Sequence, residues 1–184
     1  MTLSLTSSII ALGTGAPSSR ATKWLPCIAA ACTEYDINTP LRAAAFLAQI
    51  GCESAHLEFV KEIWGPTPAQ RRYEPPSAEA RELGNTEPGD GKKFCGRGLI
   101  ELTGRANYLR VGTMLKLDLI NHPELLELPV NAARSAGLFW QERNLNLLAD
   151  AGRITAISQR VNGGSNGLAL RLALYSAAKR ALKV

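Results

Sequence analysis

Residues 39–54 read TPLRAAAFLAQIGCES and carry the clearest secondary-structure signal of the chain. Thr39 can cap a helix and Pro40 suits its first position, so we expect a helix from there to about Ser54. Abundant alanine and scarce aromatic residues, 6% of the chain, favour packed helices over a β-sandwich. Small and apolar residues recur at helical spacing and predict a buried face, namely Leu41, Ala44, Ala45, Ala48 and Cys52.

Helical patterns recur along the rest of the chain. The turn Asn162-Gly163-Gly164 suits the end of one helix, and Asn166 can cap the next. Thr103 can begin another helix, whose buried side we expect to include Ala106, Leu109, Val111 and Met114. The expected helices cover about 3–12, 22–35, 103–116, 129–142, 153–161 and 167–182.

Residues 64–93 differ from the rest, because five prolines and four glycines interrupt them. We expect irregular structure there with a short helix near 77–83, and a loop of this length in a compact domain is usually functional or mobile. Residues 97–102 read as a short strand or a turn. The predicted fold class is mainly α, with a long irregular segment and at most a very small β element.

The length of 184 residues suits one domain over 1–184, with room for a small lobe within about 60–95. The net charge is +5 and the pI about 9.2, which fits a solvated surface or attraction to a polyanion. Basic residues are spread along the chain, so no nucleic-acid partner is expected.

Ser and Thr interrupt the apolar N-terminus, and no Lys or Arg precedes it. We therefore expect no secretory signal, and we expect the protein to accumulate in the cytosol. The sequence contains no apolar window of about 18 residues, so we expect no membrane-spanning segment.

The four cysteines are Cys27, Cys32, Cys52 and Cys95. They form no CxxC pair, and no histidine lies at ligand spacing from them, so we expect no metal and no cofactor. Four cysteines are too few for a disulfide scaffold in a chain of this length. Buried thiols in a reducing compartment are therefore the expectation.

Glu53 and Glu62 lie nine residues apart, where the alanine-rich helix gives way to Trp64-Gly65-Pro66. Glycosidic bond cleavage needs two carboxyl groups, one on each side of the bond. On an unbroken helix these two would point in opposite directions, about 180° apart. They can cooperate only if the helix ends soon after Glu53, and the spacing alone leaves open that both are surface residues.

A resemblance to a known family strengthens the interpretation of Glu53 and Glu62 as a catalytic pair. The motifs that carry it are, in chain order, Cys52-Glu53-Ser54, Glu62, the run FCGRGLIELT at 94–103, Ala106-Asn107-Tyr108 and Asn162-Gly163-Gly164. Their order resembles that of the family 19 glycoside hydrolases, which include plant-type chitinases and many bacteriophage endolysins. The similarity covers about residues 40–175, and the GRGLIxLTGRxNY run is highly specific. The segment EIWGPTPAQRRY, residues 62–73, is more similar to the endolysin branch. The resemblance implies a lysozyme-like helical globule.

The resemblance also implies an inverting, single-displacement mechanism. Glu53 would be the general acid, for which its pKa must be raised by burial or negative neighbours. Glu62 would be the base that activates a water on the opposite face of the sugar, with the carboxyl groups roughly 6.5–9.5 Å apart. Glu58 is the competing candidate for the base, and the family spacing favours Glu62.

Further site residues follow from the same resemblance. Thr103 matches a hydroxyl residue that holds the water, Glu101 stands where Gln is common, and Arg171 matches an arginine that supports the carboxylates. Asn107 and Asn162 match amides that bind sugar, although both residues also suit turns and caps. The sequence departs from the family where Ser165 and Asn166 replace an acidic residue, and where Cys52 replaces a histidine. Cys52 is expected to pack rather than to react.

Three functions are compatible with these residues. The first is a peptidoglycan-degrading endolysin, a muramidase or glucosaminidase, that accumulates in the host cytoplasm and acts in the periplasm for lysis. It would act as a monomer on glycan strands and need a holin for release. The second is a chitinase acting on N-acetylglucosamine polymers. The third is a sugar-binding module without catalysis, which the retained carboxylates Glu53 and Glu62 disfavour.

Overall fold

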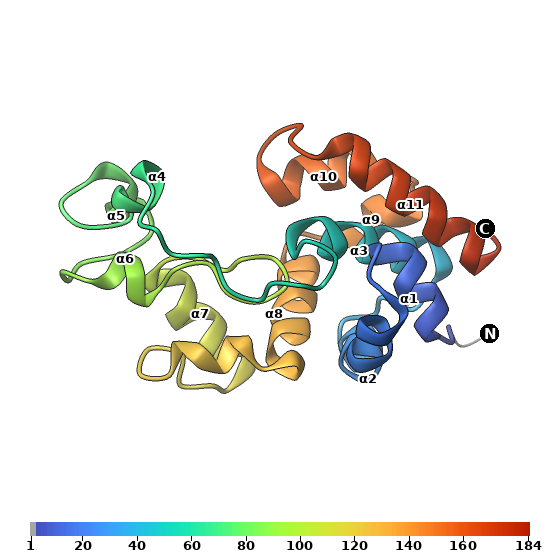
Figure 1. The fold of residues 1–184 in the computed structure, drawn as a ribbon, viewed down its shortest axis with the longest axis horizontal. Coiled ribbons are helices and arrows are strands. Elements are labelled where there is room, and N and C mark those ends of the chain that lie inside the picture. Colours follow the sequence, from blue (N-terminus) through green and yellow to red (C-terminus); the bar gives the residue numbers. More distant parts are fainter. Residues whose placement is uncertain (1–2) are drawn as a thin grey trace.

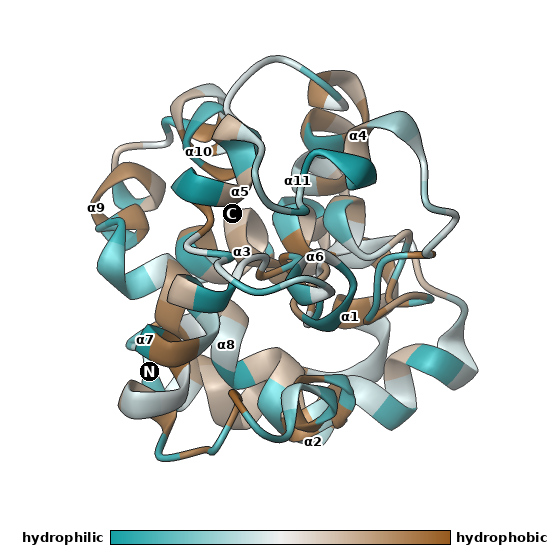
Figure 2. Cartoon of the chain, turned by 90° about the vertical axis from the view of Figure 1, so that its left-hand side faces the viewer, coloured by the Kyte–Doolittle hydropathy of each residue, from teal (hydrophilic) through white to brown (hydrophobic). Residues whose placement is uncertain are grey.

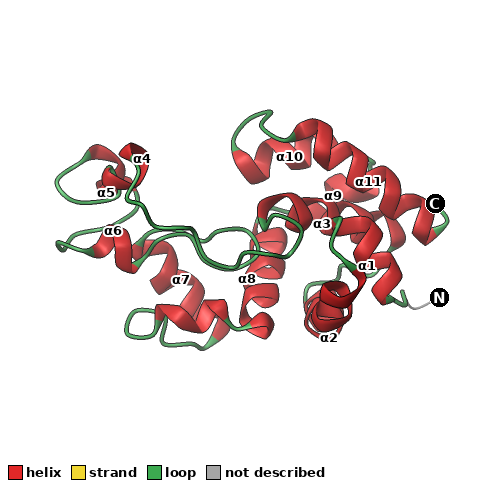
Figure 3. Cartoon of the chain, in the orientation of Figure 1, coloured by secondary structure: helices red, strands yellow, loops and turns green. Residues whose placement is uncertain are grey.

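The computed structural model describes residues 3–184, so Met1 and Thr2 of the predicted domain lie outside the described residues. The described chain is mostly helical, which confirms the predicted mainly α fold (Figure 3). The helices are α1 (Ser7–Thr14), α2 (Ser18–Glu34), α3 (Pro40–Glu53), α4 (Pro68–Arg71), α5 (Ala78–Glu82), α6 (Asp90–Lys93), α7 (Arg105–Leu115), the 3-10 helix η1 (Pro123–Glu127), α8 (Pro129–Glu142), α9 (Leu145–Asp150), α10 (Ile154–Asn162) and α11 (Leu168–Leu182).

Helix α3 lies at the centre of the larger group of helices and packs against α1 and α11 (Figure 1). The Thr39 hydroxyl caps it by accepting from the Arg42 amide at 3.3 Å, and Pro40 takes the first turn, as predicted. Every residue from 43 to 51 is buried, so α3 is buried all round rather than on one face. Its small side chains allow this, because alanine lets neighbouring helices approach closely.

The chain turns sharply once α3 has ended at Glu53. Ala55, His56 and Leu57 all have positive φ angles, of 47°, 64° and 62°. Ser54 stabilises this turn, since its hydroxyl accepts from the Leu57 amide at 2.9 Å. The helix therefore ends where cooperation between Glu53 and Glu62 requires it to end.

A minimal β element follows this turn. Isolated bridges join Lys61 to Arg97 and Arg97 to Leu102. The stretch that contains Lys61 and the stretch that contains Arg97 run side by side in Figure 1 and lead to the group of α4, α5, α6 and α7 on the left. The predicted very small β element is confirmed, as is a short helix near 77–83, which is α5. Residues 64–93 also hold α4 and α6 and are more helical than predicted. The division into a main and a small lobe stays a prediction.

Two helix starts differ from the sequence prediction. Helix α7 is capped by Gly104 with φ 94° rather than by Thr103, and α11 follows Gly167 with φ 68° rather than an Asn166 cap. Both glycines adopt a left-handed conformation that other residues rarely take.

The buried side of α7 was predicted only in part, since Val111 is buried as expected but other members of the expected set are not. Leu109 and Met114 are 58% and 49% exposed, whereas Tyr108 and Leu115 are buried. The hydroxyl of Tyr108 donates to the Cys95 carbonyl at 2.6 Å, and this polar anchor sets which face turns inward. Figure 2 shows hydrophobic and hydrophilic residues alternating along α7 and α9, as expected of half-exposed helices. The predicted helices 129–142 and 153–161 match α8 and α10.

Candidate active site

Glu53 and Glu62 line the same pocket, which has a volume of about 270 Å³. Glu101 is a third carboxyl residue in its wall, and Phe59 and Ile63 supply apolar surface. We call this the acidic pocket. The structure thus brings together the two carboxyl residues on which the sequence hypothesis depended.

Glu53 is held in place from α11. Arg171, which is only 3% exposed, donates from one guanidinium nitrogen to Glu53 and from the other to the Gln49 oxygen at 2.5 Å. Gln49 in turn donates to the Ser158 hydroxyl at 3.2 Å. A buried chain of polar groups therefore fixes the position of the Glu53 carboxylate relative to three helices. The sequence singled out Arg171 but gave no indication of Gln49 or Ser158.

Glu62 is fixed by two donors on different segments. Its Oε2 accepts from the Gly96 amide at 3.1 Å, and its Oε1 accepts from the Gln70 side-chain nitrogen at 2.8 Å. Gln70 is buried and forms a capping box with Thr67 at the start of α4. Gln70 is a site residue that the sequence reasoning missed. The Thr-x-x-Gln pattern after Pro66 was the signal that could have located it.

Glu101 lies next to Glu62 on a strained turn, with φ 44°. A Cβ placed on Gly96 would lie 3.2 Å from the Glu101 Cβ, 3.4 Å from the Glu62 Cβ and 3.4 Å from the Thr103 hydroxyl, so these three residues converge on Gly96. Desolvation by the cleft walls raises the pKa of the Glu101 carboxyl to about 7, and the charges of Glu62 and Glu53 add to the effect.

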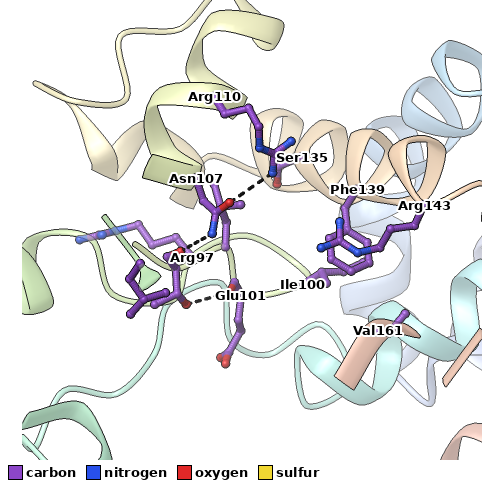
Figure 4. Close-up of a pocket in the computed structure, with 12 residues that line it drawn as sticks. Arg97, Ile100, Glu101, Asn107, Arg110, Ser135, Phe139, Arg143 and Val161 are labelled. Atoms are coloured by element: carbon purple, nitrogen blue, oxygen red, sulfur yellow. Dashed lines mark hydrogen bonds between the residues drawn. The ribbon is translucent and has the colours of Figure 1, made fainter. Parts of the chain in front are cut away.

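A second pocket, of about 240 Å³, adjoins the first, and Glu101 belongs to both (Figure 4). Thr103 and Asn107 line it. The Thr103 hydroxyl donates to the Glu101 carbonyl at 3.0 Å, and the Asn107 amide donates to the Thr103 carbonyl at 2.9 Å. These bonds hold the turn that carries Glu101. We call this the arginine pocket, because Arg97, Arg110 and Arg143 also line it.

Two of the sequence candidates lie elsewhere. Asn162 is absent from the linings of both pockets and holds the turn between α10 and α11, where its side chain donates to the Asn166 carbonyl at 2.5 Å and accepts from the Gly164 amide at 2.8 Å. Its predicted sugar contact stays a prediction. Glu58, the competing base, forms an ion pair with Arg20, is 48% exposed in its side chain and does not line the acidic pocket.

All four cysteines are free thiols, with Cys32 and Cys95 buried and Cys27 and Cys52 half-buried. Cys52 lines the acidic pocket beside Glu53, and burial raises the pKa of its thiol. Within residues 3–184 no group of three or more His, Cys, Asp or Glu side chains is arranged to hold a metal ion. None of the helices in this described part has the length and apolar character needed to cross a lipid bilayer.

The acidic pocket has the components of acid–base hydrolysis. The Glu53 carboxyl group is paired with an arginine, the Glu62 carboxyl group accepts two hydrogen bonds, and both residues line the same pocket. Two carboxyl groups that flank a bond can protonate its leaving oxygen and activate a water.

Comparisons of sequence point to one family. The chain is 29% identical to a Haemophilus influenzae glycosyl hydrolase family 19 domain-containing protein over 160 residues, which cover 74% of this chain and 78% of that protein. It is 31% identical to an Arabidopsis thaliana endochitinase over 122 residues, covering 66% of this chain and 39% of that protein. The chain thus spans well under half of the plant relative. No protein-family model matches the chain.

Solved structures share the fold. Chitinase C from Streptomyces griseus has a TM-score of 0.71 and 19% identity, with 97% of this chain and 76% of that chain covered. A bacterial family 19 chitinase has a TM-score of 0.69 and 19% identity, and 95% of that chain is covered. At this level of identity the likeness concerns the fold.

Proposed function

Because the chain belongs to glycoside hydrolase family 19, we propose that this glycoside hydrolase cleaves the β-1,4 glycan of peptidoglycan, with Glu53 as acid and Glu62 as base. The observation that carries the proposal is that both carboxyl residues line one open pocket and are held there by separate partners. Catalysis of this kind depends on such fixed positions, since a misplacement of about 1 Å costs roughly 100-fold in rate.

The residues of the acidic pocket suit a single displacement. A water on one face of the sugar attacks the anomeric carbon while Glu62 takes its proton. The bond from that carbon to the leaving oxygen breaks, and Glu53 gives that oxygen a proton. The donors Gly96 and Gln70 each occupy one oxygen of Glu62 and fix its orientation, while its remaining lone pairs can accept the proton. Thr103 would help to hold the attacking water.

We further propose that the enzyme is an endolysin. It would act as a monomer, accumulate in the host cytoplasm and reach the periplasmic cell wall once a holin has opened the inner membrane. The net charge of +5 supports attraction to the polyanionic wall, and residues 62–73 resemble the endolysin branch of the family.

Chitin is the second candidate substrate, because several of the similar proteins are endochitinases. Both polymers contain β-1,4-linked N-acetylglucosamine, so one acid–base pair could serve either. The two functions are separated by incubating the purified chain with peptidoglycan sacculi and with chitohexaose. Turbidity loss of sacculi supports the endolysin, and cleavage of chitohexaose with intact sacculi supports a chitinase.

Mass spectrometry of the released peptidoglycan fragments identifies the bond. A reducing N-acetylmuramic acid end indicates a muramidase, and a reducing N-acetylglucosamine end indicates a glucosaminidase. Intact sacculi and intact chitohexaose would instead support a sugar-binding module without catalysis.

A further inference from the structure

The arginine pocket carries positive charge directly beside the acidic pocket. Arg110 reaches it from α7, and Arg143 reaches it from the residue that follows α8. Figure 4 shows Arg143 lying over Phe139 and Arg110 near Ser135, on opposite sides of the space, while the Glu101 side chain points away from both arginines. Glu101 is the single carboxyl residue in the lining of this pocket, and it also lines the acidic pocket.

Arg143 is the unpartnered cation of this pocket. Its guanidinium carbon lies 3.6 Å from the centre of the Phe139 ring, which holds the group in a fixed plane. Its side chain makes no hydrogen bond or ion pair with residues 3–184. By contrast, Arg110 pairs with Glu142, and Arg97 pairs with Glu127 at 2.7 Å.

The surroundings of Arg143 favour an anion. Desolvation by the pocket walls lowers the pKa of Arg143, Glu142 opposes this, and nearby Arg110 adds to it. A planar guanidinium stacked on an aromatic ring is suited to bind a carboxylate through two parallel hydrogen bonds. A carboxylate would satisfy Arg143 and reduce its repulsion from Arg110.

We propose that the arginine pocket is a subsite for a carboxylate carried by the muramoyl sugar of the glycan, with Arg143 as the principal contact and Arg110 as the second. This inference rests on the proposed function, because chitin carries no carboxylate. Glu101 borders both pockets, so a glycan cleaved in the acidic pocket would place a neighbouring sugar in the arginine pocket. The carboxylate can come from the lactyl ether of a peptide-free sugar or from the peptide stem.

The test is a calorimetric titration in the Glu53→Gln background, so that no ligand is cleaved. Three tetrasaccharides are compared: a peptide-free glycan with free lactyl carboxylates, the same glycan with its peptide stems, and chitotetraose. We expect at least one carboxylate-bearing ligand to bind about tenfold more tightly than chitotetraose. A tenfold difference in Kd corresponds to the free energy of about one charge-assisted hydrogen bond. The ligand that shows the preference identifies the source of the carboxylate.

Variants locate the preference. Arg143→Gln should abolish it, and Arg143→Lys should keep part of it, because lysine has the charge but not the planar fork. Arg180→Gln is the matched control, since it removes the same charge from an exposed position on α11. Equal Kd values for carboxylate-bearing and neutral ligands, or an undiminished preference in Arg143→Gln, would overturn the proposal.

Turnover of sacculi by the unmodified chain is measured separately. If sacculi are cleaved and no preference for carboxylates is found, the subsite fails while the proposed function stands. If sacculi are not cleaved and the preference depends on Arg143, the proposed function fails while the carboxylate site stands.

Discussion

Arg171 on α11 donates a hydrogen bond to Glu53 at the end of α3, across 118 positions of sequence. The arginine is buried, and its other terminal nitrogen binds Gln49. Arg171→Leu should lower the free energy of unfolding by about 3 kcal/mol, because it leaves a partly buried carboxylate and a buried amide oxygen without their donor. Urea denaturation measures this loss.

Arg171→Lys is the matched comparison. It keeps the positive charge but cannot reach Gln49 and Glu53 with the same two-pronged geometry. We expect a smaller loss of stability than in Arg171→Leu, yet a clear loss of turnover, because Glu53 would no longer be held in one position. Wild-type turnover in a folded Arg171→Lys variant would show that Arg171 does not position the acid.

Glu62 and Glu58 offer a direct choice of base. Glu62→Gln should lower kcat by roughly 100-fold or more with little change in Tm, since the amide keeps a side-chain oxygen to accept from Gln70 or Gly96. Glu58→Gln should leave kcat within about twofold, because Glu58 pairs with Arg20 on the surface and exposed pairs contribute little. The reverse pattern of activities would transfer the role of base to Glu58.

Gly96 packs closely against three residues of the candidate site. A methyl group there would contact the side chains of Glu62, Glu101 and Thr103 at 3.2 to 3.4 Å. Gly96→Ala should therefore lower kcat about tenfold or more by displacing the base. Gly164→Ala is the control, because a Cβ at Gly164 meets nothing within 4 Å. Equal activities of the two variants would show that the position of Glu62 tolerates displacement.

The ionisation of Glu101 should set an upper pH limit on the activity. Its pKa is raised to about 7, so the carboxyl is neutral below that pH and charged above it. Ionisation adds a negative charge next to Glu62, and we expect kcat/KM of the wild type to fall as the pH rises through about 7. Glu101→Gln, which places the common family residue there, should extend activity to higher pH. Identical pH profiles would exclude this role for Glu101.

The raised pKa of Glu101 should also make the stability of the protein depend on pH. A glutamate whose pKa is higher in the folded than in the unfolded state makes the protein less stable as the pH rises from its ordinary value, about 4.3, to the raised one. The Tm of Glu101→Gln relative to wild type should therefore be higher at pH 8 than at pH 5. Thermal melts at these two pH values measure the difference.

The sequence predicted the elements whose signals are local. The Thr39 cap, the first-turn prolines of α3 and α8 and the glycine after α10 placed these helices within one or two residues. The side chains that hold the carboxylates could not be found in this way. Gln49 and Ser158 act through a buried network formed by segments more than 100 positions apart, which no local pattern encodes.

The errors have physical causes as well. The inward face of α7 depends on the bond from Tyr108 to Cys95, so its apolar pattern alone gave the wrong register for Leu109 and Met114. Asn162 is a different case, because its amide holds the turn that follows α10 while its predicted sugar contact stays a prediction. Asparagine serves both purposes, and sequence does not distinguish them.

The stereochemistry of the first product tests the paired roles of Glu53 and Glu62 most directly. Proton NMR can follow the new reducing end released from a soluble β-1,4 glycan before the anomers equilibrate. Single displacement by a water that Glu62 activates inverts the anomeric carbon, so we expect the α anomer to appear first. Initial release of the β anomer would mean a retaining mechanism and would contradict the assignment of Glu62 as a base.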